Sequence, residues 1–276
     1  MLTEAQFALI ARQAKRRVGL ALKPDRLAVV DARLAPLARR EGCACAGELV
    51  QATQERSDDL LWDAIVDALV DPSTHFFRDR AAWRALAERA IPDILRGRAP
   101  NARLRIWSAG CATGQEPFSL AILMDELREE GQGATTEIVA TDVSARLLDK
   151  ATAGIFSQFE VQRGLSVRRM IARFERIGEM WRVMDRVRAA VRFEAHNLMS
   201  EPAAMGPFDL ILCRNVLCGM DDEDRKATLE RLAGALAEDG MLMLGAGEHA
   251  VDVTDAFSRT GEDGLFLRNA YWRRAA

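Results

Sequence analysis

The sequence predicts an α/β protein in which a small helical N-terminal domain precedes a doubly wound, mostly parallel β-sheet domain. Two observations support this prediction. Residues 1–70 carry apolar residues only at helical spacing, whereas from about residue 102 short apolar runs alternate with amphipathic helices. Apolar strands that alternate with helices are typical of a parallel sheet covered on both faces. A chain of 276 residues can fill one large core and a smaller one.

Three helices are predicted in the N-terminal domain, which we assign to residues 1–72. The first follows Thr3, whose side chain can form a capping box with Gln6. The helices are expected from residue 4, at about 25–42, and after residue 57. Residues 73–100 are predicted to form a linker and a further helix.

Five strands are predicted in the second domain, which we assign to residues 101–276. The apolar runs that define them are 104–109, 137–142, 191–195, 208–213 and 240–244. Helices are expected between them at 118–127, 145–153 and 222–237. The segment 160–190 does not fit this alternation, and we predict that it forms a small inserted subdomain with a basic helix and two short strands.

The composition argues against several classes of protein. Lys and Arg number 38 and Asp and Glu 41, and the net charge of −3 argues against a dedicated nucleic-acid-binding protein. Five scattered cysteines disfavour a secreted disulfide framework, and the cysteine and histidine spacings predict no metal site. The sequence lacks a signal-peptide pattern and any apolar run near the ~18 residues of a membrane span. We therefore expect a cytoplasmic monomer without membrane insertion.

Charge is distributed unevenly along the helical domain. Residues 1–40 contain nine Lys or Arg and three acidic residues, whereas residues 41–71 contain one Arg and eight acidic residues. Two solvated helix faces would explain this pattern, and charge alone favours that interpretation. The alternative is a basic face that recruits an acidic partner.

The loop after the first predicted strand indicates the ligand, because open parallel sheets bind ligands beyond the carboxyl ends of their strands. Gly110 and Gly114 let the backbone approach a ligand closely, although an ordinary strand–helix turn would also accept them. A dinucleotide site needs three glycines, and here Glu116 occupies the position of a pyrophosphate. A carboxylate repels phosphate and suits a cationic ligand such as S-adenosylmethionine.

Suitable side chains also follow the next three strands. Asp142 ends the second strand, where an acid can accept hydrogen bonds from both ribose hydroxyls. A helix cap is the alternative for this residue, but Ser144 can fill that position instead. Residues 196–198 follow the third strand and residues 214–215 the fourth. Four consecutive strand ends with matching chemistry make coincidence the weaker explanation.

Together these segments resemble the motifs of the chemotaxis receptor methyltransferases, the CheR family. The first motif is Ser108-Ala109-Gly110-Cys111-Ala112-Thr113-Gly114-Gln115-Glu116-Pro117-Phe118-Ser119. Further similarities lie at residues 141–142, 193–198 and 208–216. The family signature that joins a helical domain to the sheet domain resembles Ser73-Thr74-His75-Phe76-Phe77-Arg78-Asp79. The motifs occur in the family's order over most of the chain.

The resemblance implies an enzyme that methylates glutamate side chains on the cytoplasmic helices of chemoreceptors and converts S-adenosylmethionine to S-adenosylhomocysteine. The cofactor-binding residues that it implies are Thr74, Arg78, Gly110, Glu116, Asp142, Asn197, Leu198, Arg214 and Asn215. Glu116 would bind the methionyl amine and Asp142 the ribose, while the adenine would lie against residues 197–198. The family's basic N-terminal face would dock on the Glu-rich receptor, here through Arg33, Arg39 and Arg40.

Arg78 is the catalytic residue that the resemblance implies. A glutamate carboxylate has an ordinary pKa of about 4.3, so it is ionised at pH 7 and needs no general base. The remaining task is in-line alignment of the carboxylate oxygen with the methyl group. Arg78 would hold one carboxylate oxygen by a charge-assisted hydrogen bond, and an interdomain salt bridge is the alternative for this residue.

The sequence departs from the family's pattern at four places. The family's tyrosine and phenylalanine correspond to Gly219 and Met220, and its signature asparagine to Pro72. Gln115 replaces the first of two glutamates, and a His-Ser-Glu motif reads Ala246-Gly247-Glu248. These changes preserve cofactor binding better than catalysis. A catalytically degenerate regulatory or docking protein that binds the same cofactor or its product is therefore the alternative, while the net charge disfavours a nucleic-acid methyltransferase.

The inserted segment gives a prediction about partners. Family members that bind a tethering peptide from the receptor C-terminus have a glycine-rich loop in this subdomain, whereas residues 174–187 contain only Gly178. We therefore predict that this protein does not bind such a peptide.

Overall fold

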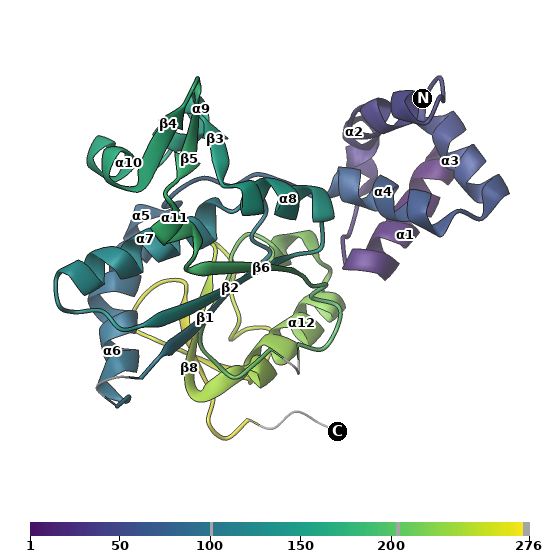
Figure 1. Ribbon diagram of the computed structural model, residues 1–276. Helices are drawn as coiled ribbons and strands as arrows, with labels where there is room; N and C mark the ends of the chain where they lie inside the picture. The colour runs from purple at the N-terminus through teal and green to yellow at the C-terminus, as the bar shows by residue number, and fades with distance from the viewer. Residues whose placement is uncertain (100–101, 203–204, 273–276) are drawn as a thin grey trace. The chain divides into compact units, whose positions relative to one another are not determined.

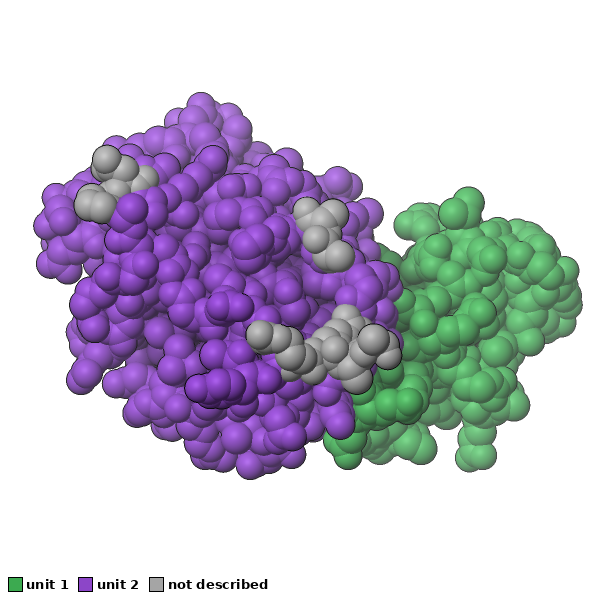
Figure 2. Space-filling view, turned by 90° about the horizontal axis from the view of Figure 1, so that it is seen from below, with its two compact units in different colours: residues 1–71, 218–224 green, residues 72–217, 225–276 purple. Residues whose placement is uncertain are grey.

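The computed structural model describes residues 1–99, 102–202 and 205–272. The chain divides into two compact units, coloured separately in Figure 2. The N-terminal unit comprises residues 1–71 and 218–224, and the sheet unit comprises the remainder. The limit predicted between residues 100 and 101 lies outside the described residues.

The N-terminal unit is helical, as predicted. Its helices are α1 (Glu4–Val18), α2 (Leu27–Arg40), α3 (Ala46–Arg56) and α4 (Asp59–Leu69), with a short 3-10 turn at Pro24–Arg26. The capping box of Thr3 and Gln6 is present at the start of α1. The sequence analysis missed α3, whose buried face contains Gly47 and Thr53 beside only two large apolar residues. Such a helix gives a weak amphipathic signal and is stabilised by its packing.

A segment from the distant part of the chain, residues 218–224, completes the N-terminal unit. The amide of Ala21 donates a hydrogen bond of 2.8 Å to the carbonyl oxygen of Gly219. Lys15 Nζ lies 2.6 Å from Asp221 Oδ2, and Met220 is buried. The chain therefore leaves the sheet unit after residue 217 and returns to it at residue 225, a crossing that the sequence analysis did not predict.

The sheet unit contains a seven-stranded sheet with the order β6-β2-β1-β7-β8-β10-β9. The strands are β1 (Leu104–Ala109), β2 (Thr136–Asp142), β6 (Val191–Ala195), β7 (Phe208–Cys213), β8 (Leu236–Leu244), β9 (Phe257–Arg259) and β10 (Leu265–Arg268). The first five strands are the predicted ones, and they pair in parallel. Strand β10 pairs antiparallel with both neighbours. Strands β9 and β10 were not predicted, because three or four residues are too few to show a period.

Helices cover both faces of the sheet, which confirms the doubly wound α/β fold (Figure 1). They are α5 (Arg80–Ala85), a π-helical turn (Leu86–Ala90), α6 (Ile91–Arg96), α7 (Gln115–Glu129), α8 (Ala145–Ala153) and α12 (Asp222–Ala235). The chain runs from β1 through β2 to β6 in one direction, and from β7 to β8 in the other. Since the crossovers are right-handed, the reversal puts α7 and α8 on one face and α12 on the other.

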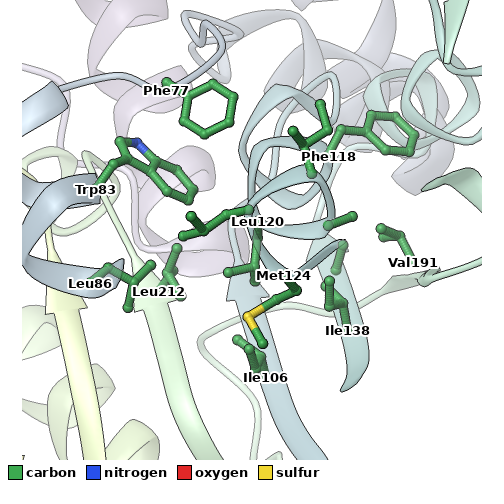
Figure 3. Packing of buried hydrophobic residues seen from close by; sticks show 14 of the residues in the cluster. Phe77, Trp83, Leu86, Ile106, Phe118, Leu120, Met124, Ile138, Val191 and Leu212 are labelled. Atoms are coloured by element: carbon green, nitrogen blue, oxygen red, sulfur yellow. The ribbon is translucent and has the colours of Figure 1, made fainter. Parts of the chain in front are cut away.

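The larger core lies between the sheet and α7 (Figure 3). Ile106, Ile138 and Leu212 come from three adjacent strands, and Leu120 and Met124 come from α7. Each is at most 4% exposed. Burying a side chain of this size contributes roughly 1.5–3 kcal/mol to stability, so this core fixes the strand ends that carry polar residues.

An inserted subdomain follows α8 and contains a three-stranded antiparallel sheet with the order β3-β5-β4. Its elements are β3 (Ile155–Ser157), α9 (Gln158–Gln162), α10 (Val167–Arg173), β4 (Phe174–Ile177), β5 (Met180–Val183) and α11 (Asp185–Arg188). The sheet starts at residue 155, before the predicted 160, because β3 finds its partner β5 about 25 residues later in the sequence. Such a pairing cannot be read from a local pattern.

Arginines hold the inserted subdomain against α7. Arg173 is 4% exposed and lies 2.8 Å from Glu129 and 3.3 Å from Asp125. Arg169 lies 2.7 Å from Glu126, and its guanidinium stacks 3.9 Å from the ring centre of Phe77. The subdomain is thereby fixed relative to the segment that carries the family signature.

Candidate cofactor and active site

The loop between β1 and α7 is held against the end of β2. The amides of Gly110 and Cys111 donate to the carbonyl oxygen of Thr141, at 2.8 and 2.9 Å. Gly110 has a φ of +76°, and a Cβ built there would lie 2.5 Å from a methyl group of Val216. Only glycine fits this position, as the loop motif suggested, and the close packing joins the ends of β1, β2 and β7.

Glu116 lies in the first turn of α7 with 12% of its side chain exposed. One carboxylate oxygen accepts a hydrogen bond of 2.9 Å from the hydroxyl of Ser108, and the other lies 3.3 Å from Nη1 of Arg214. Burial raises the pKa of Glu116 above its ordinary value, while Arg214 and Ser108 act in the opposite direction. A buried carboxylate of this kind is stabilised by a cation beside it.

Arg214 connects Glu116 to the signature segment. Its side chain is 2% exposed, and Nη2 lies 2.6 Å from Oδ2 of Asp79 and 2.9 Å from the carbonyl oxygen of Arg78. Arg214 therefore links the end of β7 with the start of α7 and with residues 78–79. The resemblance had assigned it to the pocket, but its partner Asp79 was not predicted.

Asp142 ends β2 and is 5% exposed. Its two carboxylate oxygens accept hydrogen bonds from the amides of Ala112 (2.8 Å) and Ser144 (3.0 Å). The hydroxyl of Ser144 caps α8 by accepting from the amide of Leu147, so Asp142 is not the helix cap. Two backbone amides thus hold the Asp142 carboxylate in place at the end of β2.

Asn197 and Leu198 follow β6 beside Asp142. Ala195 is the register partner of Asp142, and the amide of His196 donates 3.1 Å to the carbonyl oxygen of Asp142. The side-chain oxygen of Asn197 accepts from the amide of Met199 at 3.0 Å, which forms a tight turn, and Leu198 is half-buried. The predicted pair therefore lies at the same edge of the sheet as Asp142.

Asn215 is fixed by a residue that the sequence analysis did not include in the site. Its backbone has a φ of +61°, and its amide donates 2.7 Å to Oε2 of Glu248. The same oxygen accepts 2.9 Å from the amide of Gly245. Glu248, 9% exposed, thus joins the ends of β7 and β8. The signal was present, since Glu248 is the residue retained from the family's His-Ser-Glu motif.

Thr74 and Arg78 lie in the extended segment before α5, and both are half-buried. Nη1 of Arg78 donates 3.2 Å to the carbonyl oxygen of Ser73. The segment is attached to α7 because the amide of Phe77 donates 3.0 Å to the hydroxyl of Ser119. Phe77 and Asp79 both have positive φ, so this turn is strained and is held by its partners.

The three predicted docking arginines lie on α2 of the N-terminal unit and differ in their surroundings. Arg33 donates 2.7 Å to the carbonyl oxygen of Leu69 and lies 3.8 Å from Asp71, so it contributes to the packing of its own unit. Arg39 is exposed. Arg40 is exposed and lies 3.1 Å from Glu41.

Among residues 1–99, 102–202 and 205–272, no His, Cys, Asp and Glu side chains gather in a group of three or more that could bind a metal ion. No helix of that part of the chain is long and apolar enough to cross a membrane.

The donor set at the edge of the sheet fits S-adenosylmethionine. Glu116 and Asp142 are buried carboxylates with acceptor capacity for an ammonium group and for ribose hydroxyls. The loop that a dinucleotide would occupy with its pyrophosphate presents the Glu116 carboxylate, which repels phosphate. The doubly wound sheet and this set of side chains define an S-adenosylmethionine-dependent methyltransferase.

The chain belongs to the CheR methyltransferase family. Residues 72–265 match the family model described as "CheR methyltransferase, SAM binding domain". Chemotaxis protein methyltransferase 1 of Pseudomonas aeruginosa is 35% identical over 257 residues, which cover 92% of this chain and 93% of that protein. Chemotaxis protein methyltransferase Cher2 of Pseudomonas putida is 34% identical over 88% of each chain. The Vibrio parahaemolyticus protein is 33% identical over 93% of each chain.

Replacing Asp142 with alanine should weaken S-adenosylmethionine binding by about 1–3 kcal/mol, because ribose hydroxyls would lose a buried acceptor. Titration calorimetry with the full-length protein measures this change. Ser144→Ala is the matched control: it removes the cap of α8 and should lower stability by about 0.5–2 kcal/mol while leaving the dissociation constant unchanged. An unchanged dissociation constant in the Asp142 variant would contradict the assignment.

Proposed function

We propose that this methyltransferase transfers the methyl group of S-adenosylmethionine to glutamate side-chain carboxylates on the cytoplasmic helices of chemoreceptors. The proposal rests on the hydrogen bonds of Arg78, which attach its backbone to the cofactor residues and leave most donors of its guanidinium unused within the described part of the sheet unit. Its carbonyl oxygen accepts a hydrogen bond from Arg214, which binds Glu116. Among the described residues of the sheet unit its guanidinium donates only to Ser73. A guanidinium with remaining donors beside the cofactor residues suits an anionic acceptor.

A glutamate acceptor requires alignment and little acid–base chemistry. Its carboxylate is ionised at pH 7 and attacks the methyl carbon directly, so no proton is transferred. When bound, S-adenosylmethionine supplies the electrophilic methyl group, and its sulfur retains the electron pair of the broken bond. Glu116 and Asp142 hold the amine and the ribose, and Arg78 orients one oxygen of the acceptor. The relatives named above as chemotaxis protein methyltransferases support this assignment.

A test of the proposal is to incubate the protein with methyl-labelled S-adenosylmethionine and its cognate receptor. Base-labile label on the receptor is expected, because carboxyl methyl esters hydrolyse in base. A receptor with its methyl-accepting glutamates replaced by alanine is the control and should remain unlabelled. Cofactor binding without any label on the receptor would contradict the enzymatic proposal.

The second candidate function is a degenerate family member that binds the cofactor or its product and acts as a regulatory or docking protein. Gly219 and Met220 favour it, because they remove the aromatic side chains that the family resemblance leads one to expect beside the methyl group. Pro72 removes a further side-chain donor at the signature. The labelling experiment separates the two candidates.

The basic residues of α2 are proposed to attract the acidic receptor. Replacing Arg39 and Arg40 together with alanine should raise the KM for receptor several-fold and reduce the salt dependence of the rate, because exposed charges act mainly on association. The kcat should be unchanged. Removing Arg89 and Arg96, two exposed arginines of the sheet unit, is the matched control for net charge. Equal effects of both double variants would contradict docking by α2.

The inserted subdomain is proposed to lack a site for a receptor tethering peptide. Strands β4 and β5 are joined by the two-residue turn Gly178-Glu179, since Ile177 pairs with Met180. A turn this short cannot form the glycine-rich loop of the peptide-binding members. Titration calorimetry with a receptor C-terminal tethering peptide should therefore show no binding. Capture of the protein at micromolar affinity would refute the prediction.

A further inference from the structure

The chain at residues 163–169 runs directly along the signature segment. Gly164 has a φ of +106°, and a Cβ built there would overlap the carbonyl oxygen of Phe76. The ring of Phe76 is enclosed by two rings of the inserted subdomain, with ring centres 5.1 Å away for Phe156 and 5.5 Å for Phe174. Backbone contact and ring packing therefore fix the position of Arg163 relative to residues 75–78.

Several charged side chains act on His75, and most of them are arginines. His75 is half-buried, and its pKa is lowered below the ordinary value first by burial and then by the positive charges of Arg163, Arg78 and Arg214, against the opposing charge of Asp79. Arg163 of the inserted subdomain and Arg78 of the signature therefore both act on the charge of His75, and the contact of Gly164 with Phe76 holds the two chain segments together.

Among the described residues of the sheet unit, the guanidiniums of Arg163 and Arg78 differ from those of the neighbouring arginines in having no carboxylate partner. Arg214 binds Glu116 and Asp79, and the arginines of α10 that face α7 are also paired with acids. Arg163 is exposed and forms no ion pair with any described residue of the sheet unit, and the same holds for Arg78. Like charges held together without an anion repel each other, and an arriving carboxylate would relieve that repulsion.

We propose that Arg163 is a substrate-positioning residue that forms, with Arg78, a two-guanidinium clamp for the acceptor carboxylate. The inference deepens the proposed function and rests on it. Two cations favour an ionised glutamate over the neutral amide of glutamine, so the clamp makes the inserted subdomain a determinant of acceptor specificity. Because a guanidinium donates in a planar fork, lysine at this position would keep the charge but lose the two-point geometry.

The test is Arg163→Met in the full-length protein. The KM for receptor should rise roughly ten- to hundredfold, the range of one charge-assisted hydrogen bond. The kcat, the dissociation constant of S-adenosylmethionine and the melting temperature should be unchanged. Arg163→Lys should recover part of the loss. Arg168→Met is the matched control, because Arg168 is an exposed arginine of the same subdomain, in the first turn of α10.

A binding experiment keeps the inference testable apart from turnover. Two helical peptides with the methylation-region sequence, one with glutamate and one with glutamine at the acceptor position, are titrated in the presence of S-adenosylhomocysteine. The wild-type protein should prefer the glutamate peptide about tenfold or more, and Arg163→Met should lose that preference. Loss of receptor labelling by the wild-type protein with the preference retained would contradict the proposed function but not the clamp. An unchanged KM and preference, or a weakened cofactor affinity, would overturn the clamp.

Discussion

Replacing Arg214 with methionine is expected to lower the free energy of unfolding by about 3–5 kcal/mol, because it leaves the nearly buried carboxylate of Glu116 without its cationic partner. The loss should be measurable by urea denaturation. Cofactor affinity should also fall, since Glu116 would no longer be held in place.

The pH dependence of the Arg214→Met variant follows from the raised pKa of Glu116. A carboxyl group whose pKa is higher in the folded than in the unfolded state binds its proton more tightly when folded, so its contribution to stability improves as pH falls through the folded pKa. The deficit of the variant should therefore shrink on acidification. Glu116→Gln/Arg214→Met should recover part of the stability at neutral pH without recovering cofactor binding. A neutral-pH deficit under 1 kcal/mol would contradict this account of the pair.

Replacing Gly164 with alanine is expected to destabilise the protein by about 3 kcal/mol or more. A side chain at a φ of +106° costs of order 1–3 kcal/mol, and overlap with the carbonyl oxygen of Phe76 adds a packing penalty of about 1–3 kcal/mol. Thermal and urea denaturation of the full-length protein measure the sum.

Gly178→Ala is the matched control for Gly164→Ala. Gly178 has a φ of +60°, but no atom lies within 4 Å of a Cβ built there. Replacing Gly178 should lower the free energy of unfolding by only about 1 kcal/mol, the cost of a side chain at positive φ without a steric overlap. The difference between the two variants isolates the contact between the inserted subdomain and the signature. Equal losses would mean that this contact does not constrain the fold.

The sheet was readable from the sequence because parallel strands are buried on both faces. Every residue of β7, Phe208–Cys213, is buried, and such a strand appears as an unbroken apolar run. The same reasoning fails for β9 and β10, the last two strands at one side of the sheet, because they contain only three and four residues. It also fails for β3, whose partner strand lies far along the chain.

The location of the site could be predicted from the sequence, whereas the hydrogen-bond and ion-pair partners of its residues could not. Strand ends of a parallel sheet meet at one edge, so Glu116, Asp142 and Arg214 could be assigned to a common site from their places in the sequence. The partners that hold them could not. Asp79 lies 135 residues before Arg214, and the link exists only through tertiary packing. Glu248 is likewise joined to Asn215 across two strand ends.

The crossing at residues 218–224 limits how this protein can be divided. A fragment that begins at residue 72 matches the family model and contains the whole seven-stranded sheet. It would nevertheless expose Met220 and leave Asp221 without Lys15, five to seven residues after Arg214 and Asn215. Truncation of the gene at residue 72 therefore removes the partners of the segment that follows Arg214 and Asn215, so the recombinant protein should retain both units.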